Sequence, residues 1–115
     1  MQILKPEYPF EKTSVLICPK CGDECTHMQS ATLFFRDIED SITGLKITAG
    51  NKTVAIASNA DQDNPSSRRD GMRMLFRCES GHMFNLDIYQ HKGPTYFEAQ
   101  FIGDDPEHPG NAAHP

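Results

Sequence analysis

Apolar and polar residues alternate along much of this chain, which is the pattern expected of strands with one buried face. The alternation is clearest over residues 72–77 and 84–88, where every second residue is apolar. Further β-rich stretches occupy residues 13–17, 31–38, 45–49, 53–57 and 96–101. The pattern predicts a mostly β fold, built as a small antiparallel sheet.

Turn residues divide these stretches in a way that favours hairpins. Gly50 and Asn51 separate residues 45–49 from 53–57, so this pair of stretches predicts a hairpin. Gly93-Pro94 separates the last two predicted strands. Residues 31–38, which contain Phe34 and Phe35, predict a strand that is buried on both faces or covered by another layer. The best helix candidate, residues 37–45, is interrupted by glycine and lacks an apolar stripe, so no helix is predicted.

A chain of 115 residues is long enough for one compact domain. We expect an N-terminal arm over residues 1–12, the β domain over 13–103, and a disordered, proline-bearing tail over 104–115. No apolar run is long enough to span a membrane, and the first residues lack a secretory pattern. These features predict a cytoplasmic protein.

Two short cysteine- and histidine-bearing turns lie far apart in the sequence. The first reads Cys18-Pro19-Lys20-Cys21-Gly22 and the second reads Cys78-Glu79-Ser80-Gly81-His82. Each spacing lets one tight turn direct two ligands at a single ion, and a glycine in each turn relieves the backbone. Together the turns supply three thiolates and one imidazole, a closed set of ligands for structural zinc. The predicted zinc ligands are Cys18, Cys21, Cys78 and His82.

Other uses of these side chains remain open at this stage. Cys25 or His27 could replace His82 as the fourth ligand; otherwise Cys25 is a small buried residue or a spare thiol. The cysteines could also simply pack in the core. Two disulfides are disfavoured without an export signal, and a rubredoxin-like iron centre would prefer four thiolates. A thiol–disulfide function for Cys18 and Cys21 is disfavoured because no βαβ pattern surrounds them.

The charge is negative overall but unevenly distributed. A net charge of −5 argues against non-specific coating of nucleic acid, which requires many neutralised phosphates. Four arginines, Arg68, Arg69, Arg73 and Arg77, nevertheless lie within ten residues, in and just after the polar segment 64–71, and predict a local basic patch. The candidate partner-binding residues are Arg68, Arg69, Arg73 and Lys92. The alternative is a solvated loop whose arginines pair with nearby acids, such as Asp37, Glu39, Asp70 or Asp87.

Several blocks, taken together, resemble small zinc-ribbon proteins of unknown function from phages, mobile elements and bacterial genomes. The blocks are Cys18-Pro19-Lys20-Cys21-Gly22, residues 35–40, residues 64–71, Phe76-Arg77-Cys78-Glu79 and residues 90–95. The second turn departs from the commoner form, because Gly81 replaces a second cysteine and His82 follows it. The resemblance implies a zinc ribbon with a β-hairpin inserted between its two knuckles, and it assigns no activity.

Three classes of function follow from these features. The leading hypothesis is a zinc-stabilised, non-enzymatic module that binds a protein or nucleic acid, by analogy a regulator or inhibitor of a host factor. The second is a metal-dependent nuclease or hydrolase, for which the candidate residues are His27, Asp37, Glu39, Asp40 and His91. The third is a structural homo-oligomer in which the edge strand 96–101 pairs with its twin.

Overall fold

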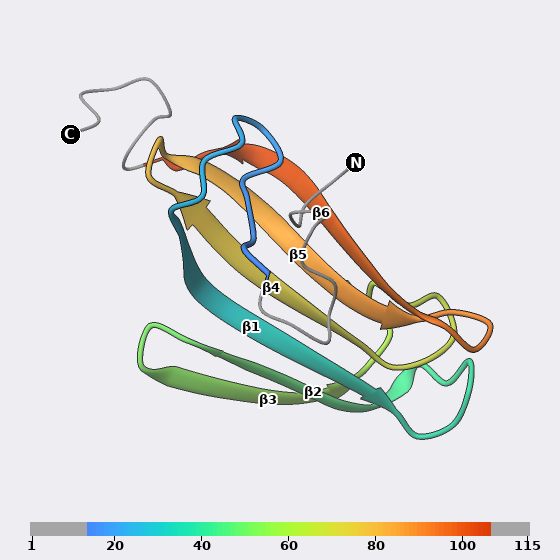
Figure 1. The fold of residues 1–115 in the computed structure, drawn as a ribbon. Helices are drawn as coiled ribbons and strands as arrows, with labels where there is room; N and C mark the ends of the chain where they lie inside the picture. Colours follow the sequence, from blue (N-terminus) through green and yellow to red (C-terminus); the bar gives the residue numbers. More distant parts are fainter. Residues whose placement is uncertain (1–13, 107–115) are drawn as a thin grey trace.

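The fold is that of a computed structural model, which describes residues 14–106. Within that range six strands form one antiparallel sheet, and no helix is present (Figure 1). The strands are β1 (Thr26–Arg36), β2 (Thr43–Gly50), β3 (Thr53–Asn59), β4 (Gly71–Cys78), β5 (His82–Gln90) and β6 (Thr95–Asp104). The predicted mostly β, antiparallel fold is confirmed. The predicted arm and most of the predicted tail lie outside the described residues.

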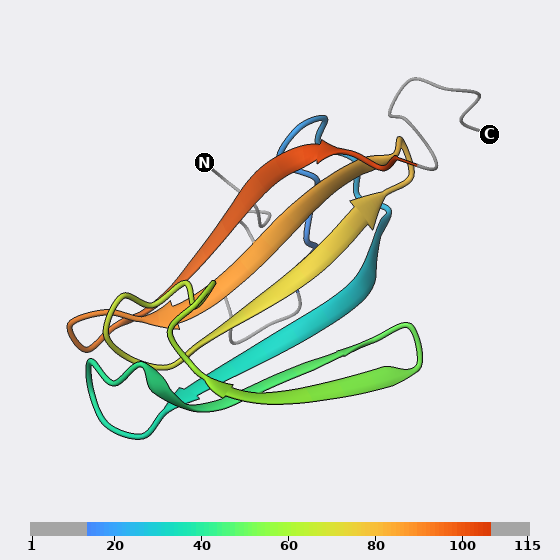
Figure 2. The same ribbon diagram turned by 180° about the vertical axis from the view of Figure 1, so that it is seen from behind.

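The order of strands across the sheet is β3-β2-β1-β4-β5-β6. Each half, β1 to β3 and β4 to β6, is a meander of neighbouring strands, and the pairing of β1 with β4 joins the two halves (Figure 2). This pairing sets Thr26, at the start of β1, opposite Cys78, at the end of β4. The two cysteine-bearing turns, distant in sequence, are therefore neighbours at one end of the sheet.

One face of the sheet is apolar across all six strands, because directly paired residues share a face. A first row of cross-strand partners consists of Ile56, Ile47, Leu33, Met72, Ile88 and Phe97. The next row, toward the cysteine-bearing end, consists of Val54, Ala49, Ala31, Met74, Leu86 and Ala99. A row on the opposite face is mostly polar: Ala55, Thr48, Thr32, Arg73, Asp87 and Glu98.

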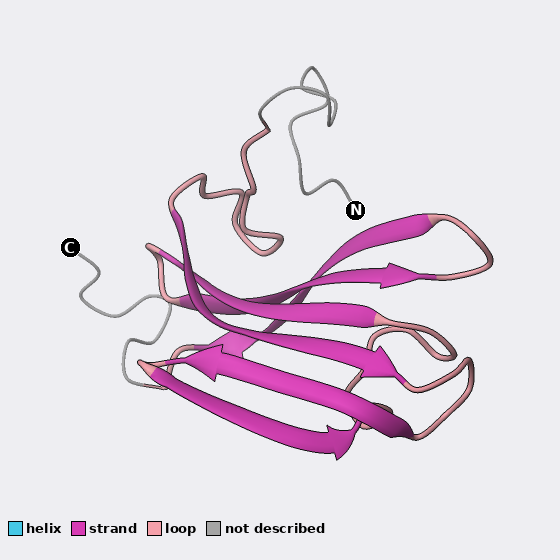
Figure 3. Cartoon of the chain, turned by 90° about the horizontal axis from the view of Figure 1, so that it is seen from below, coloured by secondary structure: helices cyan, strands magenta, loops and turns pink. Residues whose placement is uncertain are grey.

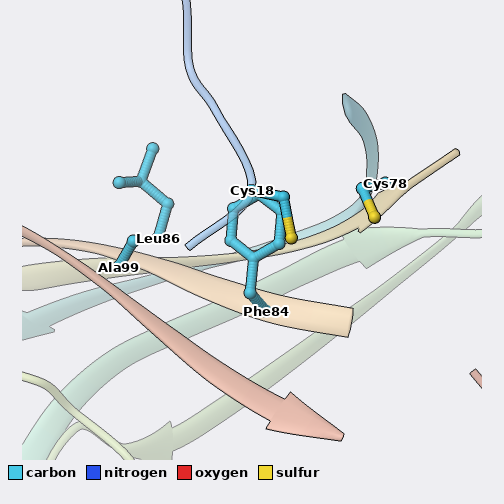
Figure 4. Close-up of a cluster of buried hydrophobic side chains, with 5 residues drawn as sticks. All are labelled: Cys18, Cys78, Phe84, Leu86 and Ala99. Atoms are coloured by element: carbon cyan, nitrogen blue, oxygen red, sulfur yellow. The ribbon is translucent and has the colours of Figure 1, made fainter. Parts of the chain in front are cut away.

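The main core lies on the apolar face of β4 to β6, beneath the segment that precedes β1 (Figure 3). Its buried residues are Cys18, Cys78, Phe84, Leu86 and Ala99, and Figure 4 shows the Cys18 side chain beside the ring of Phe84. The partly buried Leu16, Met74 and Phe76 pack against them. The predicted strand over residues 13–17 is wrong in its described part, which has only an isolated bridge at Leu16. This segment crosses the sheet face as a covering layer, so its apolar residues pack against the core.

A second packed region lies on the opposite face, around Phe34 and Arg36. Phe34 is only 1% exposed, and Lys46 lies over its ring with Nζ 5.5 Å from the centroid. Arg36 is buried as well, and its guanidinium binds the loop between β3 and β4. The expectation that residues 31–38 are buried on both faces is therefore wrong: Phe35, on the apolar face, is 44% exposed, and Ile38 lies beyond the strand.

The predicted hairpin around Gly50 is confirmed as β2 and β3. Gly50 pairs with Thr53, and Asn51 and Lys52 between them both have positive φ, as a two-residue type I′ turn requires. Strands β3 and β6 form the two edges of the sheet. None of the described residues belongs to a helix that could cross a membrane.

Candidate metal centre

Four side chains from two distant segments meet at the end of the sheet where β4 stops. Cys18 and Cys21 belong to the turn before β1, Cys78 is the last residue of β4, and His82 is the first residue of β5. One ligand atom from each of the four lies within 4.8 Å of the other three. The structure thus brings together the four residues that the sequence predicts as zinc ligands.

The spacing of these atoms fits one tetrahedral ion. The Sγ atoms of Cys21 and Cys78 are 3.8 Å apart, and His82 Nδ1 lies 3.5 Å from Cys78 Sγ and 3.9 Å from Cys18 Sγ. Zinc bonds of about 2.3 Å to sulfur and about 2.0 Å to nitrogen, at tetrahedral angles, require sulfur–sulfur edges near ~3.8 Å and sulfur–nitrogen edges near ~3.5 Å. The cluster could therefore hold a metal ion, and its three thiolates and imidazole suit zinc.

Both turns have the backbone that such a site needs. Gly22 and Gly81 have φ values of 77° and 86°, a region that side-chain-bearing residues rarely adopt. The amide of each glycine donates to the carbonyl oxygen of its turn's first cysteine, Cys18 at 2.8 Å and Cys78 at 2.9 Å. The amide of Lys20 donates to Cys18 Sγ at 3.4 Å. A hydrogen bond from an amide to sulfur favours the thiolate form, which is the form that binds metal, so the first turn stabilises Cys18 as a ligand.

Two residues of β6 lie beside the ring of His82. Its Nδ1 faces the sulfur atoms, while its Nε2 lies 4.0 Å from a carboxylate oxygen of Asp104. The ring meets Phe101 edge to face, with centroids 5.7 Å apart. At 4.0 Å the carboxylate lies beyond direct hydrogen-bond distance. A carboxylate near the far nitrogen is the usual support for a metal-binding histidine, because a hydrogen bond there selects the tautomer that leaves the other nitrogen free, and Asp104 is the residue placed for this role. Sequence reasoning missed Asp104, because alternation continued from residues 97–101 leads to Gly103. The irregularity in the β5–β6 pairing, which brings Asp104 opposite His82, has no signal in the sequence.

The thiol of Cys18 is unlike that of an ordinary surface cysteine. Burial raises the pKa of the Cys18 thiol to about 12, although backbone amides of Cys21 and Lys20 act in the opposite direction. None of the described cysteines is in a disulfide. A buried thiol with a raised pKa becomes a thiolate at neutral pH only beside a compensating cation. Metal binding at this cluster must therefore release protons.

The alternative ligands stand apart from the cluster. Cys25 is exposed, so the expectation of a small buried residue is wrong and that of a spare thiol fits. Its amide donates to Asp23 at 2.9 Å, and its carbonyl accepts from the amide of Glu79. His27 forms an ion pair with Glu79 at the surface. His82 is accordingly the histidine of the cluster.

Of the predicted partner-binding residues, three line one small cavity. The cavity, of about 50 Å³, is bounded by Arg68, Arg69, Gln90, His91 and Lys92. Acidic residues already pair with both arginines. Arg68 binds Asp40 at 2.8 Å and Glu39 at 2.7 Å, and Arg69 also binds Glu39 at 2.7 Å. The Arg68 guanidinium lowers the pKa of Asp40 below its ordinary value.

The fourth, Arg73, lies elsewhere on the polar face. Its Nε and Nη2 bind both carboxylate oxygens of Asp87, at 2.8 and 2.9 Å, as direct cross-strand partners. This bidentate pair, with the Asp87 side chain 6% exposed, raises the pKa of the arginine. Arg73 is therefore a structural residue of the sheet and is separate from the cavity that Arg68, Arg69 and Lys92 line.

The candidate catalytic acids do not form a cluster of their own, because each already has a hydrogen-bond or ion-pair partner. Asp37 accepts a hydrogen bond from the hydroxyl of Thr43 at 2.7 Å, while Glu39 and Asp40 bind Arg68. His91 stacks edge to face on Tyr96. Among residues 14–106, the Cys18, Cys21, Cys78 and His82 cluster is the one metal-competent group of three or more such side chains.

Comparisons with protein-family models, with curated proteins and with solved structures found no match for this chain. The site geometry and the surfaces of the sheet are therefore the basis for assigning a function.

Proposed function

We propose that this protein is a zinc-stabilised, non-enzymatic binding module of zinc-ribbon type. The observation that carries the proposal is the closed spacing of Cys18, Cys21, Cys78 and His82. Four protein ligands leave no open position for water, and catalytic zinc keeps one. Three reduced thiolates also suit a reducing compartment, which supports a cytoplasmic location. In this proposal the β2–β3 hairpin is the insertion between the two knuckles.

Zinc stabilises the fold because it joins the covering segment before β1 to the turn between β4 and β5. The main core lies directly beneath that joint and contains two of the ligands, Cys18 and Cys78. Structural zinc contributes about 10–16 kcal/mol of apparent binding free energy in small peptides, against about 5–15 kcal/mol for the unfolding of a whole domain. Removal of zinc should therefore unfold most of the domain.

Elemental analysis of purified variants tests the zinc site. Wild type should bind one zinc per chain, and Cys78→Ser and His82→Ala should lose it together with most of the cooperative unfolding transition. Cys25→Ser is the matched control, because that thiol is exposed and outside the cluster. A natively folded, metal-free wild type, or loss of zinc in Cys25→Ser alone, would contradict the proposal.

The proposed binding surface is the apolar side of the sheet. Residues of β2 and β3 on that side are exposed, among them Leu45, Val54 and Ile56. Contiguous exposed apolar residues of this size usually mark a protein interface. Combined with the resemblance to proteins of phages and mobile elements, this surface is the basis for proposing a protein-binding regulator of a host factor.

A phosphate-bearing ligand is the second candidate, and the cavity lined by Arg68, Arg69 and Lys92 favours it. Arginine and lysine around a concave surface are suited to phosphate oxygens. Fluorescence anisotropy with labelled DNA and RNA at two salt concentrations tests this candidate. Salt-sensitive binding that Lys92→Met weakens would support it, and no binding at low salt would remove it.

A further inference from the structure

Two tyrosines stack on each other at the end of the sheet farther from the cysteines. Tyr89 of β5 and Tyr96 of β6 are direct cross-strand partners on the polar side of the sheet. Their ring centroids are 5.7 Å apart, their planes differ by 16°, and the Tyr89 hydroxyl donates to Glu98 at 3.1 Å. Because β6 is an edge strand, no strand lies beyond the Tyr96 ring. One face of that ring is against Tyr89, and the other points away from β5 in a residue that is 44% exposed.

The stacked pair lies beside a basic cavity, between the β3–β4 loop and the β5–β6 turn (Figures 1 and 2). The residues that line the basic cavity are Arg68, Arg69, Gln90, His91 and Lys92. The ring of His91 meets Tyr96 edge to face, with centroids 6.1 Å apart, so His91 belongs both to the cavity and to the aromatic cluster. The Ser66 hydroxyl donates to the carbonyl oxygen of Gln90 at 2.8 Å. This bond fastens the loop to the end of β5, and the cavity therefore keeps its place beside the tyrosines.

The basic cavity retains donors for an anion, although acids already contact its arginines. Arg68 uses Nε and Nη2 to bind Asp40 and Glu39, and Arg69 contacts Glu39 through Nη2. The Nη1 groups of both arginines donate no hydrogen bond to any of residues 14–106. The side chain of Lys92, exposed at the turn, likewise has no ion pair within that range. Three cations therefore face two acids, which leaves one net positive charge.

We propose that this end of the sheet binds single-stranded nucleic acid, with an unpaired base on the outer face of Tyr96 and its phosphate in the basic cavity. The inference rests on the phosphate-bearing ligand of the proposed function and names its class. Every base has an aromatic face, so an exposed ring beside cations suits a single strand of any sequence. The bases of a duplex are stacked on each other and cannot reach the ring. One net positive charge limits the contact to one or two phosphates.

Fluorescence anisotropy on the full-length, zinc-loaded protein tests the proposal. The probes are a short labelled oligo-dT, an oligo-rU of the same length, and the oligo-dT paired with oligo-dA. Wild type should bind at least one single strand more tightly than the duplex, and the two single strands separate DNA from RNA. The logarithm of the affinity should fall against the logarithm of salt concentration with a slope of about −0.7 to −1.4, as one or two phosphates require.

Tyr96→Leu removes the stacking surface and should weaken single-strand binding about tenfold without changing the salt slope. Tyr96→Phe retains the ring and should bind like wild type. Phe97→Leu is the matched control and should also bind like wild type, because Phe97 is adjacent and similarly exposed but faces the other side of the sheet. Lys92→Met should instead reduce the magnitude of the salt slope by about 0.7, because it removes one phosphate contact.

Three results would overturn the proposal: no binding of either single strand at low salt, equal affinity for the duplex, or equal affinities of Tyr96→Leu and Phe97→Leu. If Lys92→Met weakens binding and Tyr96→Leu does not, the phosphate-bearing ligand stands and the stacked base is wrong. Zinc content measured on the same samples separates loss of this site from loss of the zinc site. Tyr96→Val, whose side chain favours strands, repeats the test should Tyr96→Leu fail to fold.

Discussion

Arg36 is the residue whose replacement best tests the packing on the polar side of the sheet. Its side chain is 2% exposed. The guanidinium donates four hydrogen bonds, to the carbonyl oxygens of Arg69 (2.8 Å), Ser41 (2.6 Å) and Ser66 (2.9 Å) and to the carboxylate of Asp61 (3.0 Å). One side chain thus connects the end of β1 to the loop that precedes β4.

The Arg36→Met substitution retains an apolar stem and removes all four donors. A hydrogen bond to a charged group is worth about 1.5–3 kcal/mol, and an acceptor left buried without a partner loses about 1–3 kcal/mol. Ser66 is 1% exposed, so its carbonyl stays unpaired. The other acceptors can recover water: Asp61 is 51% exposed, Ser41 is only half-buried, and Arg69 lines the adjacent cavity of about 180 Å³. We therefore expect a loss of about 3–5 kcal/mol, well below the sum of the four bonds.

Urea denaturation of zinc-loaded protein, followed by circular dichroism, measures this loss. Arg69→Met is the control, since its guanidinium is half exposed and pairs with Glu39 at the surface; it should cost less than about 1 kcal/mol. The loss of unfolding free energy in Arg36→Lys should lie between those of Arg36→Met and Arg69→Met. A lysine ammonium cannot reach all four acceptors, which are arranged around the planar guanidinium of arginine. If Arg36→Met were as stable as Arg69→Met, the guanidinium would not hold the loop.

Three smaller predictions concern other parts of the molecule. Asp104→Asn should weaken zinc binding about tenfold in a competition titration with a chelator, because the carboxylate supports His82; unchanged affinity would remove that role. Gly44→Ala should lower the midpoint of thermal unfolding, because a Cβ there would overlap the facing strand's backbone and φ is 156°; an unchanged midpoint would show that the strands can separate. Arg68→Met should return the pKa of Asp40 upward toward its ordinary value in an NMR titration. The ion pair with Arg68 favours the ionised form of Asp40, so the small stability that it contributes is lost as the pH falls through the folded-state pKa of Asp40. If the pKa of Asp40 stayed low in Arg68→Met, another group would be the cause of the shift.

Local sequence patterns were sufficient for most of the strands and for the four clustered side chains. Alternation gives the face of each residue, so the inward series Met72, Met74 and Phe76 could be assigned without a structure. Ligand spacing is equally local: Cys18 and Cys21 occupy one turn, and Cys78 and His82 another. Only the pairing of the two turns required an inference about distant residues. That inference came from the number of ligands, because each turn offers two and structural zinc takes four.

Features that depend on the order of strands were beyond that reasoning. Phe35 looked buried because its neighbours are apolar, yet it is 44% exposed, because within residues 14–106 the segment that covers the sheet packs over β4 to β6 and not over this part of β1. The burial of Arg36 has no signal in the local sequence, because the loop that contacts it lies about 30 residues further along the chain. Leu16 has strand-like neighbours but packs on the face of the sheet. Burial of this kind is set by long-range contacts, which residue periodicity does not encode.

The metal centre and the exposed apolar side of β2 and β3 belong to one continuous sheet. At the cysteine-bearing end, the segment before β1 provides the second layer, and the ligands Cys18 and Cys78 are themselves core residues beneath it. This segment contains few apolar side chains, so a metal crosslink stabilises its packing on the sheet more than additional hydrophobic contacts would. At the β2–β3 end there is no such crosslink, and Val54 and Ile56 remain exposed. Within residues 14–106 the sheet is therefore crosslinked at one end and uncovered at the other, which is the physical reason for proposing that binding involves the uncovered half.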